Sequence, residues 1–205
     1  MQIFWFGQSM IKIETKESTV VLDPYSNEKV KMPSFESDIA VCSGKETECS
    51  KLRGNPFIIS AQGEYEIKGI FVLSYEVSSG KDKHLINRVE IDNVAIAHLS
   101  DLSFVPTKEE LEQLGDIDVL IIPVGGHNVL DAKVATGLIH QIEPKIVIPV
   151  YFNIPALKEN LDSLDAFLKQ MGVKEPEHVD KLSIKWQDFS DEEEKMSVVV
   201  LNEQI

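Results

Sequence analysis

The hydrophobic and polar positions along the chain divide it into a strand-rich first half and a second half in which strands alternate with helices. Apolar and polar side chains alternate over residues 10–14, as in a half-exposed strand, and residues 69–77 are rich in β-branched and aromatic side chains. Residues 85–91 and 94–97 flank an Asp-Asn pair, which predicts a hairpin. Further strands are predicted at residues 2–6, 18–22, 39–42, 56–60 and 63–68.

Helix signals begin only after residue 100. A capping-box sequence at residues 107–110 predicts a short helix that ends at Gly115. Asp131 is predicted to cap a second helix, whose apolar side chains recur at helical spacing up to Ile142. A third helix is predicted to begin at Pro155 and to end at Gly172. Strands are predicted at residues 118–124, 145–150, 182–186 and 197–201.

This order of elements indicates a fold class. Antiparallel strands followed by strand–helix units are typical of α+β or layered α/β proteins, in which two sheets pack face to face and helices cover their outer faces. We expect one domain that spans residues 1–205. The hydrophobic pattern alone does not specify a four-layer arrangement.

The charge of the chain restricts the partners that it can have. The formal net charge is −14, with 34 acidic and 20 basic side chains, so the surface repels phosphate backbones and we expect no nucleic-acid partner. No apolar run reaches membrane-spanning length and no signal peptide is apparent, so we expect a cytoplasmic protein without a membrane partner. The two cysteines, Cys42 and Cys49, are expected to be reduced thiols.

Nine short segments, taken in order, resemble the metallo-β-lactamase superfamily. They are Trp5-Phe6-Gly7, Asp23-Pro24 and residues 38–43, 54–57, 63–69, 97–102, 118–126, 131–135 and 142–149. The similarity is to the bacterial branch of small zinc-dependent hydrolases related to ascorbate-phosphate lactonases. It implies a four-layer αββα sandwich with a metal site at one edge of the two sheets.

The same resemblance implies where the metal ligands should stand, and there the chain departs from the family. The positions fall on Gly44, Glu46, Glu48, Cys49, Ser79, Asp101 and Tyr151. The resemblance makes Asp101 the one retained ligand, a bridging aspartate, while the expected histidines are absent. A catalytic zinc site takes about three protein ligands. Gly44 offers no side chain, and the phenol of a tyrosine, with a pKa of about 10, is a poor ligand at neutral pH. We therefore expect a vestigial site without a cofactor. Zinc or another divalent cation would bind only through Asp101, Cys49 and Glu46.

Three further residues are candidates for lining a cleft: Asp23, His98 and His127. His98 lies three residues before Asp101, a spacing that suits acid–base chemistry or a structural hydrogen bond. His127 follows two glycines in a loop that borders the site in this fold. No role is predicted for His84, His140 or His178.

The leading hypothesis is a degenerate relative of the zinc hydrolases that has lost catalysis and binds a small ligand or a partner. The alternative is a hydrolase with an altered metal site of Glu, Cys and Asp ligands, or one that needs no metal. A third possibility is a subunit that associates with an intact, metal-binding relative. The sequence leaves the partner open between a small molecule and self-association.

Overall fold

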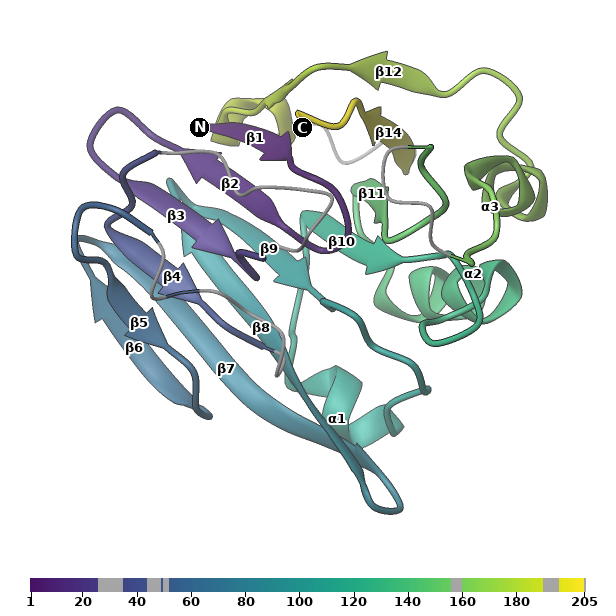
Figure 1. Ribbon diagram of the computed structural model, residues 1–205, viewed down its shortest axis with the longest axis horizontal. Helices are drawn as coiled ribbons and strands as arrows, with labels where there is room; N and C mark the ends of the chain where they lie inside the picture. The colour runs from purple at the N-terminus through teal and green to yellow at the C-terminus, as the bar shows by residue number, and fades with distance from the viewer. Residues whose placement is uncertain (26–34, 44–48, 50–51, 156–159, 190–195, 205) are drawn as a thin grey trace.

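Two β-sheets pack face to face, and three α-helices lie beside the larger one (Figure 1). The structure, a computed structural model, describes residues 1–25, 35–43, 49, 52–155, 160–189 and 196–204. Both sheets mix parallel and antiparallel pairs, so the predicted layered α/β class is confirmed.

The smaller sheet has six strands in the order β13-β1-β2-β3-β4-β5, of which β1 to β5 come from the first third of the chain and β13 from its last part. β1, β2 and β3 form an antiparallel meander, whereas β3, β4 and β5 are parallel neighbours. The strands are β1 (Gln2–Trp5), β2 (Ile11–Glu14), β3 (Thr19–Leu22), β4 (Ile39–Val41), β5 (Phe57–Ile59) and β13 (Leu182–Ser183).

The larger sheet has eight strands in the order β12-β14-β11-β10-β9-β8-β7-β6. β6, β7, β8 and β9 pair antiparallel. β9, β10, β11, β14 and β12 pair parallel, in that order across the sheet. The strands are β6 (Gly63–Ile67), β7 (Ile70–Ser79), β8 (Asp82–Ile91), β9 (Val94–His98), β10 (Val119–Pro123), β11 (Ile146–Val150), β12 (Glu177–Val179) and β14 (Ser197–Leu201).

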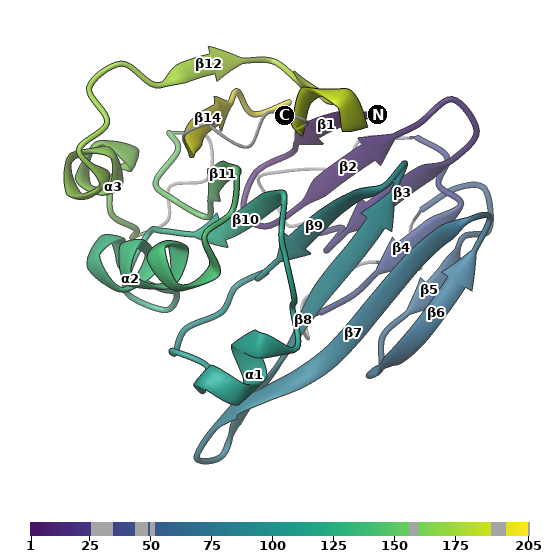
Figure 2. The ribbon, with the colours of Figure 1, turned by 180° about the vertical axis from the view of Figure 1, so that it is seen from behind.

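The helices are α1 (Lys108–Glu112), α2 (Ala132–Ile142) and α3 (Leu164–Met171), with a 3-10 helix, η2, at Trp186–Phe189. The predicted capping box is confirmed, because Thr107 and Glu110 each bond the other's backbone N–H. Asp131 caps α2 by accepting from the Val134 N–H at 2.8 Å, a contact that stabilises a helix by about 1 kcal/mol. Seen from behind, α2 and α3 lie together at the β10–β11 end of the larger sheet (Figure 2).

Several elements differ from the prediction. The strand predicted at residues 182–186 covers only Leu182–Ser183, since Trp186 begins η2, and β12 was not predicted. The third helix begins at Leu164 rather than at Pro155, because the preceding residues are tied to a neighbouring loop: the Asp162 N–H donates to the Gly125 carbonyl at 2.7 Å. The hairpin of β7 and β8 is also longer than predicted. Both strands extend to Ser79 and Asp82, and only Gly80 and Lys81 turn the chain.

Buried apolar side chains of both sheets form one continuous cluster between them. Every residue of β4 and of β10 is buried, as expected of strands covered on both faces, whereas β2 alternates between buried and half-buried positions. The sequence pattern therefore records correctly which strands lie at the centre of the molecule.

We predict that Gly125→Ala destabilises the fold and that Gly137→Ala does not. A Cβ on Gly125 would meet the carbonyl oxygen of Tyr151, with the Phe152 Cα at 3.1 Å, so backbone would have to move. We expect a loss of roughly 1–3 kcal/mol in the free energy of unfolding, the range for overpacking.

Gly137 is the matched control, because it is exposed on α2 and a Cβ there meets nothing within 4 Å. Alanine at this position should raise stability by about 0.5–1 kcal/mol through its helix propensity. Denaturant unfolding of both variants checks the pair. Equal effects of the two substitutions would contradict the close packing of the Gly125 loop against Tyr151.

Candidate functional site

At one edge of the two sheets, five strands are followed within a few residues by a non-glycine residue whose φ angle is positive, in the left-handed region. The residues are Gln8 (φ 44°), Asp23 (φ 46°), Ser100 (φ 55°), His127 (φ 58°) and Tyr151 (φ 54°), after β1, β3, β9, β10 and β11. Non-glycine residues in this conformation cost of order 1–3 kcal/mol each and gather at functional sites. The Tyr151 N–H donates to the Gln8 carbonyl at 3.1 Å, which joins the two sheets at this edge. The edge is therefore where a functional site is expected.

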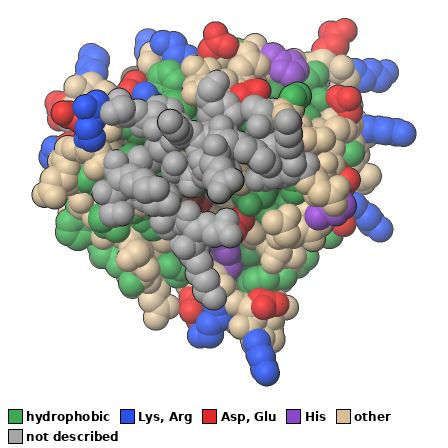
Figure 3. Space-filling model, viewed as in Figure 1, with side chains coloured by type: hydrophobic (Ala, Val, Ile, Leu, Met, Phe, Trp, Pro, Cys, Tyr) green, Lys and Arg blue, Asp and Glu red, His purple; other side chains and the backbone are tan. Residues whose placement is uncertain are grey.

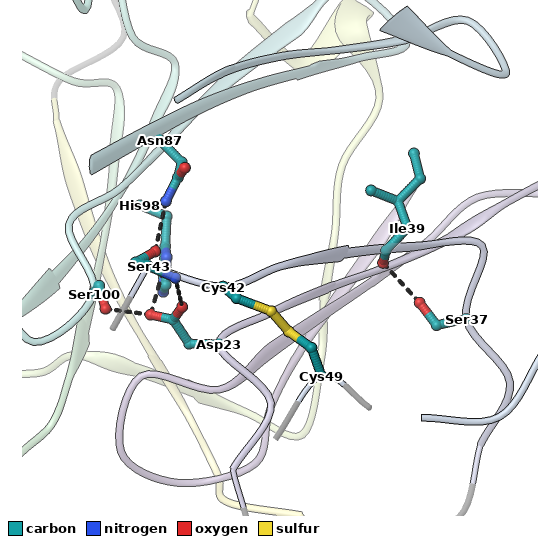
Figure 4. Close-up of a disulfide and its surroundings, with 9 residues drawn as sticks. All are labelled: Asp23, Ser37, Ile39, Cys42, Ser43, Cys49, Asn87, His98 and Ser100. Carbon is teal, nitrogen blue, oxygen red and sulfur yellow. Dashed lines mark hydrogen bonds and ion pairs between the residues drawn. A yellow bond between two sulfur atoms is a disulfide. The ribbon is translucent and has the colours of Figure 1, made fainter. Parts of the chain in front are cut away.

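At this edge the buried carboxylate of Asp23 connects three strands (Figure 4). Its Oδ1 accepts a hydrogen bond from the Ser43 N–H, at the end of β4, at 2.7 Å. Its Oδ2 accepts from the Ser100 hydroxyl, after β9, and lies 3.9 Å from His98 Nδ1. A carboxylate buried in this way is stabilised by such donors, which replace its lost hydration.

A row of buried polar side chains faces Asp23 from the larger sheet. Ser74, Asn87 and His98 are cross-strand neighbours on β7, β8 and β9, and all three are buried. The Asn87 Nδ2 donates to the Ser43 hydroxyl at 2.6 Å. The row thus continues into the end of β4, so polar groups cross the otherwise apolar space between the sheets.

The hydrogen bond between His98 and Ser9 fixes the tautomer of the His98 ring. Its Nε2 lies 2.9 Å from the Ser9 carbonyl oxygen, which only accepts, so the proton of a neutral imidazole is on Nε2. Burial lowers the pKa of His98, although the Asp23 carboxylate and the hydrogen bond to Ser9 oppose that shift. A neutral His98 leaves Nδ1 as an acceptor, and among the described residues Nδ1 has no hydrogen-bond donor.

Asp101, which the family resemblance marks as a metal ligand, lies next to this cluster and is paired with a histidine that the sequence did not single out. His84 Nδ1, on β8, is 3.4 Å from Asp101 Oδ1, and the Ser100 hydroxyl is 3.2 Å from the same oxygen. No signal in the sequence marks His84, because seventeen residues separate it from Asp101 and only the pairing of β8 with β9 brings them together.

The expectation of reduced cysteines is wrong for this structure. Cys42 and Cys49 form a disulfide, with their Cα atoms 6.6 Å apart, and both residues are buried. With two cysteines the sequence gives no indication of pairing, because the bond depends on where the chain returns after β4. Cys49 stands at an expected metal-ligand position, and a disulfide sulfur is not the thiolate that binds metal ions.

The other expected metal-site positions do not gather into one group. Gly44, Glu46 and Glu48 lie outside the described residues. Ser79 is exposed at the tip of the β7–β8 hairpin, whereas Tyr151 is buried at the end of β11. Of the proposed cleft residues, Asp23 and His98 face each other.

His127, although it follows β10 at the same edge, lies apart from Asp23 and His98. Its ring is half exposed and lies 3.7 Å from an Asp162 carboxylate oxygen. No described contact joins it to the Asp23 cluster.

The described donors do not fit the metal centre that the family resemblance implies. Within the described part of the chain, no three His, Cys, Asp or Glu side chains are close enough together to hold a metal ion. A catalytic zinc site takes three protein ligands and keeps one open position.

A groove of about 1000 Å³ opens at the opposite edge of the sheets, between the hairpin turns. It is lined by the turns at residues 14–18, 68–70 and 91–93 and by residues 183–188. Its charges are mixed, with Lys16 and Lys185 beside Glu17 and Asp188, so they do not indicate one class of ligand. The strand ends at Asp23 remain the better candidate, because the buried polar groups converge there.

The two face-to-face sheets, with polar groups gathered at their strand ends, define a metallo-β-lactamase fold. Residues 2–151 match the family described as "Beta-lactamase superfamily domain", and the chain therefore belongs to the metallo-β-lactamase superfamily. A crystal structure from Thermotoga maritima is 28% identical to this chain, covers 99% of both chains and has a TM-score of 0.85. That protein is assigned provisionally to the Zn-dependent hydrolases of the superfamily.

The curated relatives match a smaller share of this chain. A UPF0173 protein of Pyrococcus abyssi is 23% identical over 177 residues, which cover 74% of this chain and 83% of the relative. A UPF0173 metal-dependent hydrolase of Pyrococcus horikoshii is 30% identical over 99 residues, 44% of each protein. The metallo hydrolase Igni18 of Ignicoccus hospitalis, at 17% identity and a TM-score of 0.64 over 90% of this chain and 99% of its own, shows the shared fold alone. Relatives of this chain are thus described as metal-dependent hydrolases.

The described helices are all too short to cross a bilayer, since the longest, α2, has 11 residues.

We predict that the protein loses stability as the pH falls below about 6.5, the pKa of an unfolded-state histidine. His98 has a lowered pKa in the folded protein, so the unfolded chain takes up a proton that the folded chain resists. The stabilisation is present above pH 6.5 and declines towards pH 5. His98→Gln, whose amide still donates to Ser9, should flatten this dependence in thermal unfolding.

His178→Gln is the control for this experiment, because His178 is exposed on β12. It should leave the pH dependence unchanged. A stability that increases on acidification, and does so only when His98 is present, would show instead that His98 is an imidazolium paired with Asp23.

Proposed function

We propose that this protein is a non-catalytic member of its superfamily that binds a small ligand or a partner at the Asp23 edge. It does so without the metal centre of its hydrolytic relatives. The observation that carries the proposal is the disulfide between Cys42 and Cys49, because it removes a thiolate from an expected metal-ligand position.

The remaining described donors support this proposal because they already have protein partners. Asp23 accepts from Ser43 and Ser100, and Asp101 is paired with His84. A metal ion would have to break these contacts to collect its ligands. The position expected to hold a further histidine is Tyr151, whose phenol is a weak ligand at neutral pH.

The same edge contains buried polar atoms that could bond to a ligand. Three buried acceptor or donor atoms, Asn87 Oδ1, His98 Nδ1 and His84 Nε2, have no partner among the described residues. An unsatisfied buried polar atom costs about 1–3 kcal/mol, so a bound molecule that satisfies these atoms is favoured. Because Asn87 Oδ1 and a neutral His98 Nδ1 both accept, the fitting ligand offers N–H or O–H groups.

The alternative function is hydrolysis at an altered site. The observation in its favour is a row of neighbouring polar groups that resembles a proton-relay arrangement. The Ser100 hydroxyl bonds to Asp23 and Asp101, and the two carboxylates lie 3.9 Å from His98 Nδ1 and 3.4 Å from His84 Nδ1, respectively. Glu46, which belongs to the proposed alternative ligand set, lies outside the described residues.

Metal analysis tests the main proposal. Protein purified without chelator and with the disulfide intact should contain far less than one zinc, iron or manganese ion per chain, measured by inductively coupled plasma mass spectrometry. Asp101→Asn should leave the metal content per chain unchanged. Asp92→Asn, at an exposed carboxylate in the β8–β9 turn, is the matched control. Stoichiometric metal that Asp101→Asn removes, and Asp92→Asn does not, would refute the loss of the metal centre.

A turnover assay separates the two functions. With lactone, phosphodiester and thioester substrates, the wild-type protein should show no rate above that of an Asp101→Ala or a Cys49→Ala variant. The hydrolase alternative predicts the opposite: measurable turnover that Asp101→Ala reduces by about 100-fold or more, the scale of losing one general acid–base or metal-binding group.

A further inference from the structure

The most exposed pair of neighbouring large hydrophobic side chains lies on an edge strand. Phe57 and Ile58 of β5 are 49% and 45% exposed, and β5 ends the smaller sheet, with β4 as its one described neighbour. Figure 3 shows hydrophobic side chains gathered on the side of the molecule where β5 and β6 lie. An edge strand of this kind offers unpaired backbone groups to another strand.

The other sheet edges carry features that discourage strand pairing. β6 ends the larger sheet beside β5 and exposes Glu64 and Glu66, whose like charges would face each other across a β6–β6 pair. β12 exposes Glu177, and β13 has only two residues. β5 is also short, with three residues after Pro56, but among the described edge strands of more than two residues it is the one that exposes no charged side chain.

The chain around β5 is also unusual in its charge. Residues 54–63 contain no charged side chain, although they are largely exposed and the protein carries a net charge of −14. Two copies of so acidic a protein repel each other over most of their surface. The uncharged segment is a place where two copies can approach without that repulsion.

We propose that β5 pairs with β5 of a second copy about a two-fold axis, so that the protein is a homodimer with one sheet continuous across the interface. Identical edges that pair antiparallel form a closed, self-complementary contact. The antiparallel direction also brings the start of one β5, which follows Arg53, towards the end of the other, which precedes Glu64. The pairing therefore predicts that opposite charges lie near both ends of the paired strands.

The side chains around β5 in one copy are arranged so that the strand can pair without disturbing the core. The rings of Phe57 and Tyr65 lie 6.2 Å apart between centroids, so these two aromatic side chains pack edge to face between β5 and β6. Ile59 is buried inside the sandwich, which anchors the strand, and Ile58 alternates to the opposite face. Ile58 is therefore the residue to change, because its substitution leaves the core intact.

The test is the mass of the full-length protein in solution, measured by sedimentation equilibrium from about 1 μM to about 1 mM. The wild-type protein should reach twice the chain mass of 23.0 kDa. Ile58→Lys should weaken dimerisation at least about tenfold, since it places two like charges in the contact. The control is Val105→Lys, because Val105 is a 50% exposed hydrophobic residue away from the sheet edges.

A charge swap tests the orientation of the two strands. Arg53→Glu should weaken the dimer, and adding Glu64→Arg to it should restore most of the lost affinity. Circular dichroism confirms that each variant is folded. A monomer at all concentrations would overturn the proposal, as would a dimer that Ile58→Lys leaves intact. A dimer that Ile58→Lys weakens but the charge swap does not rescue would overturn the antiparallel two-fold pairing. These outcomes are independent of metal content and turnover.

Discussion

The buried carboxylate of Asp23 is the interaction on which this edge of the protein depends. It accepts hydrogen bonds from the end of β4, through the Ser43 N–H, and from the end of β9, through the Ser100 hydroxyl. It therefore fixes the distance between the two sheets where their strands stop. Replacing it with an apolar residue would leave the Ser43 N–H without this acceptor and the Ser100 hydroxyl with only Asp101, and an unsatisfied polar group costs more than the lost contact itself.

The surrounding residues follow from this constraint. To reach Asp23 after β3 and Ser100 after β9, the chain turns through left-handed conformations that glycine would adopt more easily. The polar row of Asn87 and His98 then lies opposite, where a purely apolar core would leave the carboxylate unsupported. Backbone strain, buried charge and buried polar side chains thus occur together, and the packed sheets on either side hold them in place.

The superfamily fold is present here, although no three of the described His, Cys, Asp or Glu side chains form a group that could hold a metal ion. Fold is set by the buried strands and by the pairing of β3, β4 and β5 with their neighbours, none of which needs a metal ligand. The disulfide between Cys42 and Cys49 lies just after β4, where the family resemblance places metal ligands. A covalent link is one way to hold a loop in place without a metal ion, since it restricts the unfolded chain.

The amino-acid sequence by itself determined the fold class, most strands and most helix ends, because these depend on local patterns: alternation in β2, continuous burial in β4 and β10, and the caps at Thr107 and Asp131. It did not indicate β12. It also marked Asp23, His98 and Asp101. Tertiary structure alone decided that His84 meets Asp101, that Asn87 reaches Ser43 and that the two cysteines pair. The first two contacts join residues far apart in the chain, and even the cysteines, seven residues apart, meet only because of the path that the chain takes after β4. Such contacts depend on strand register and sheet packing, which hydrophobic periodicity does not encode.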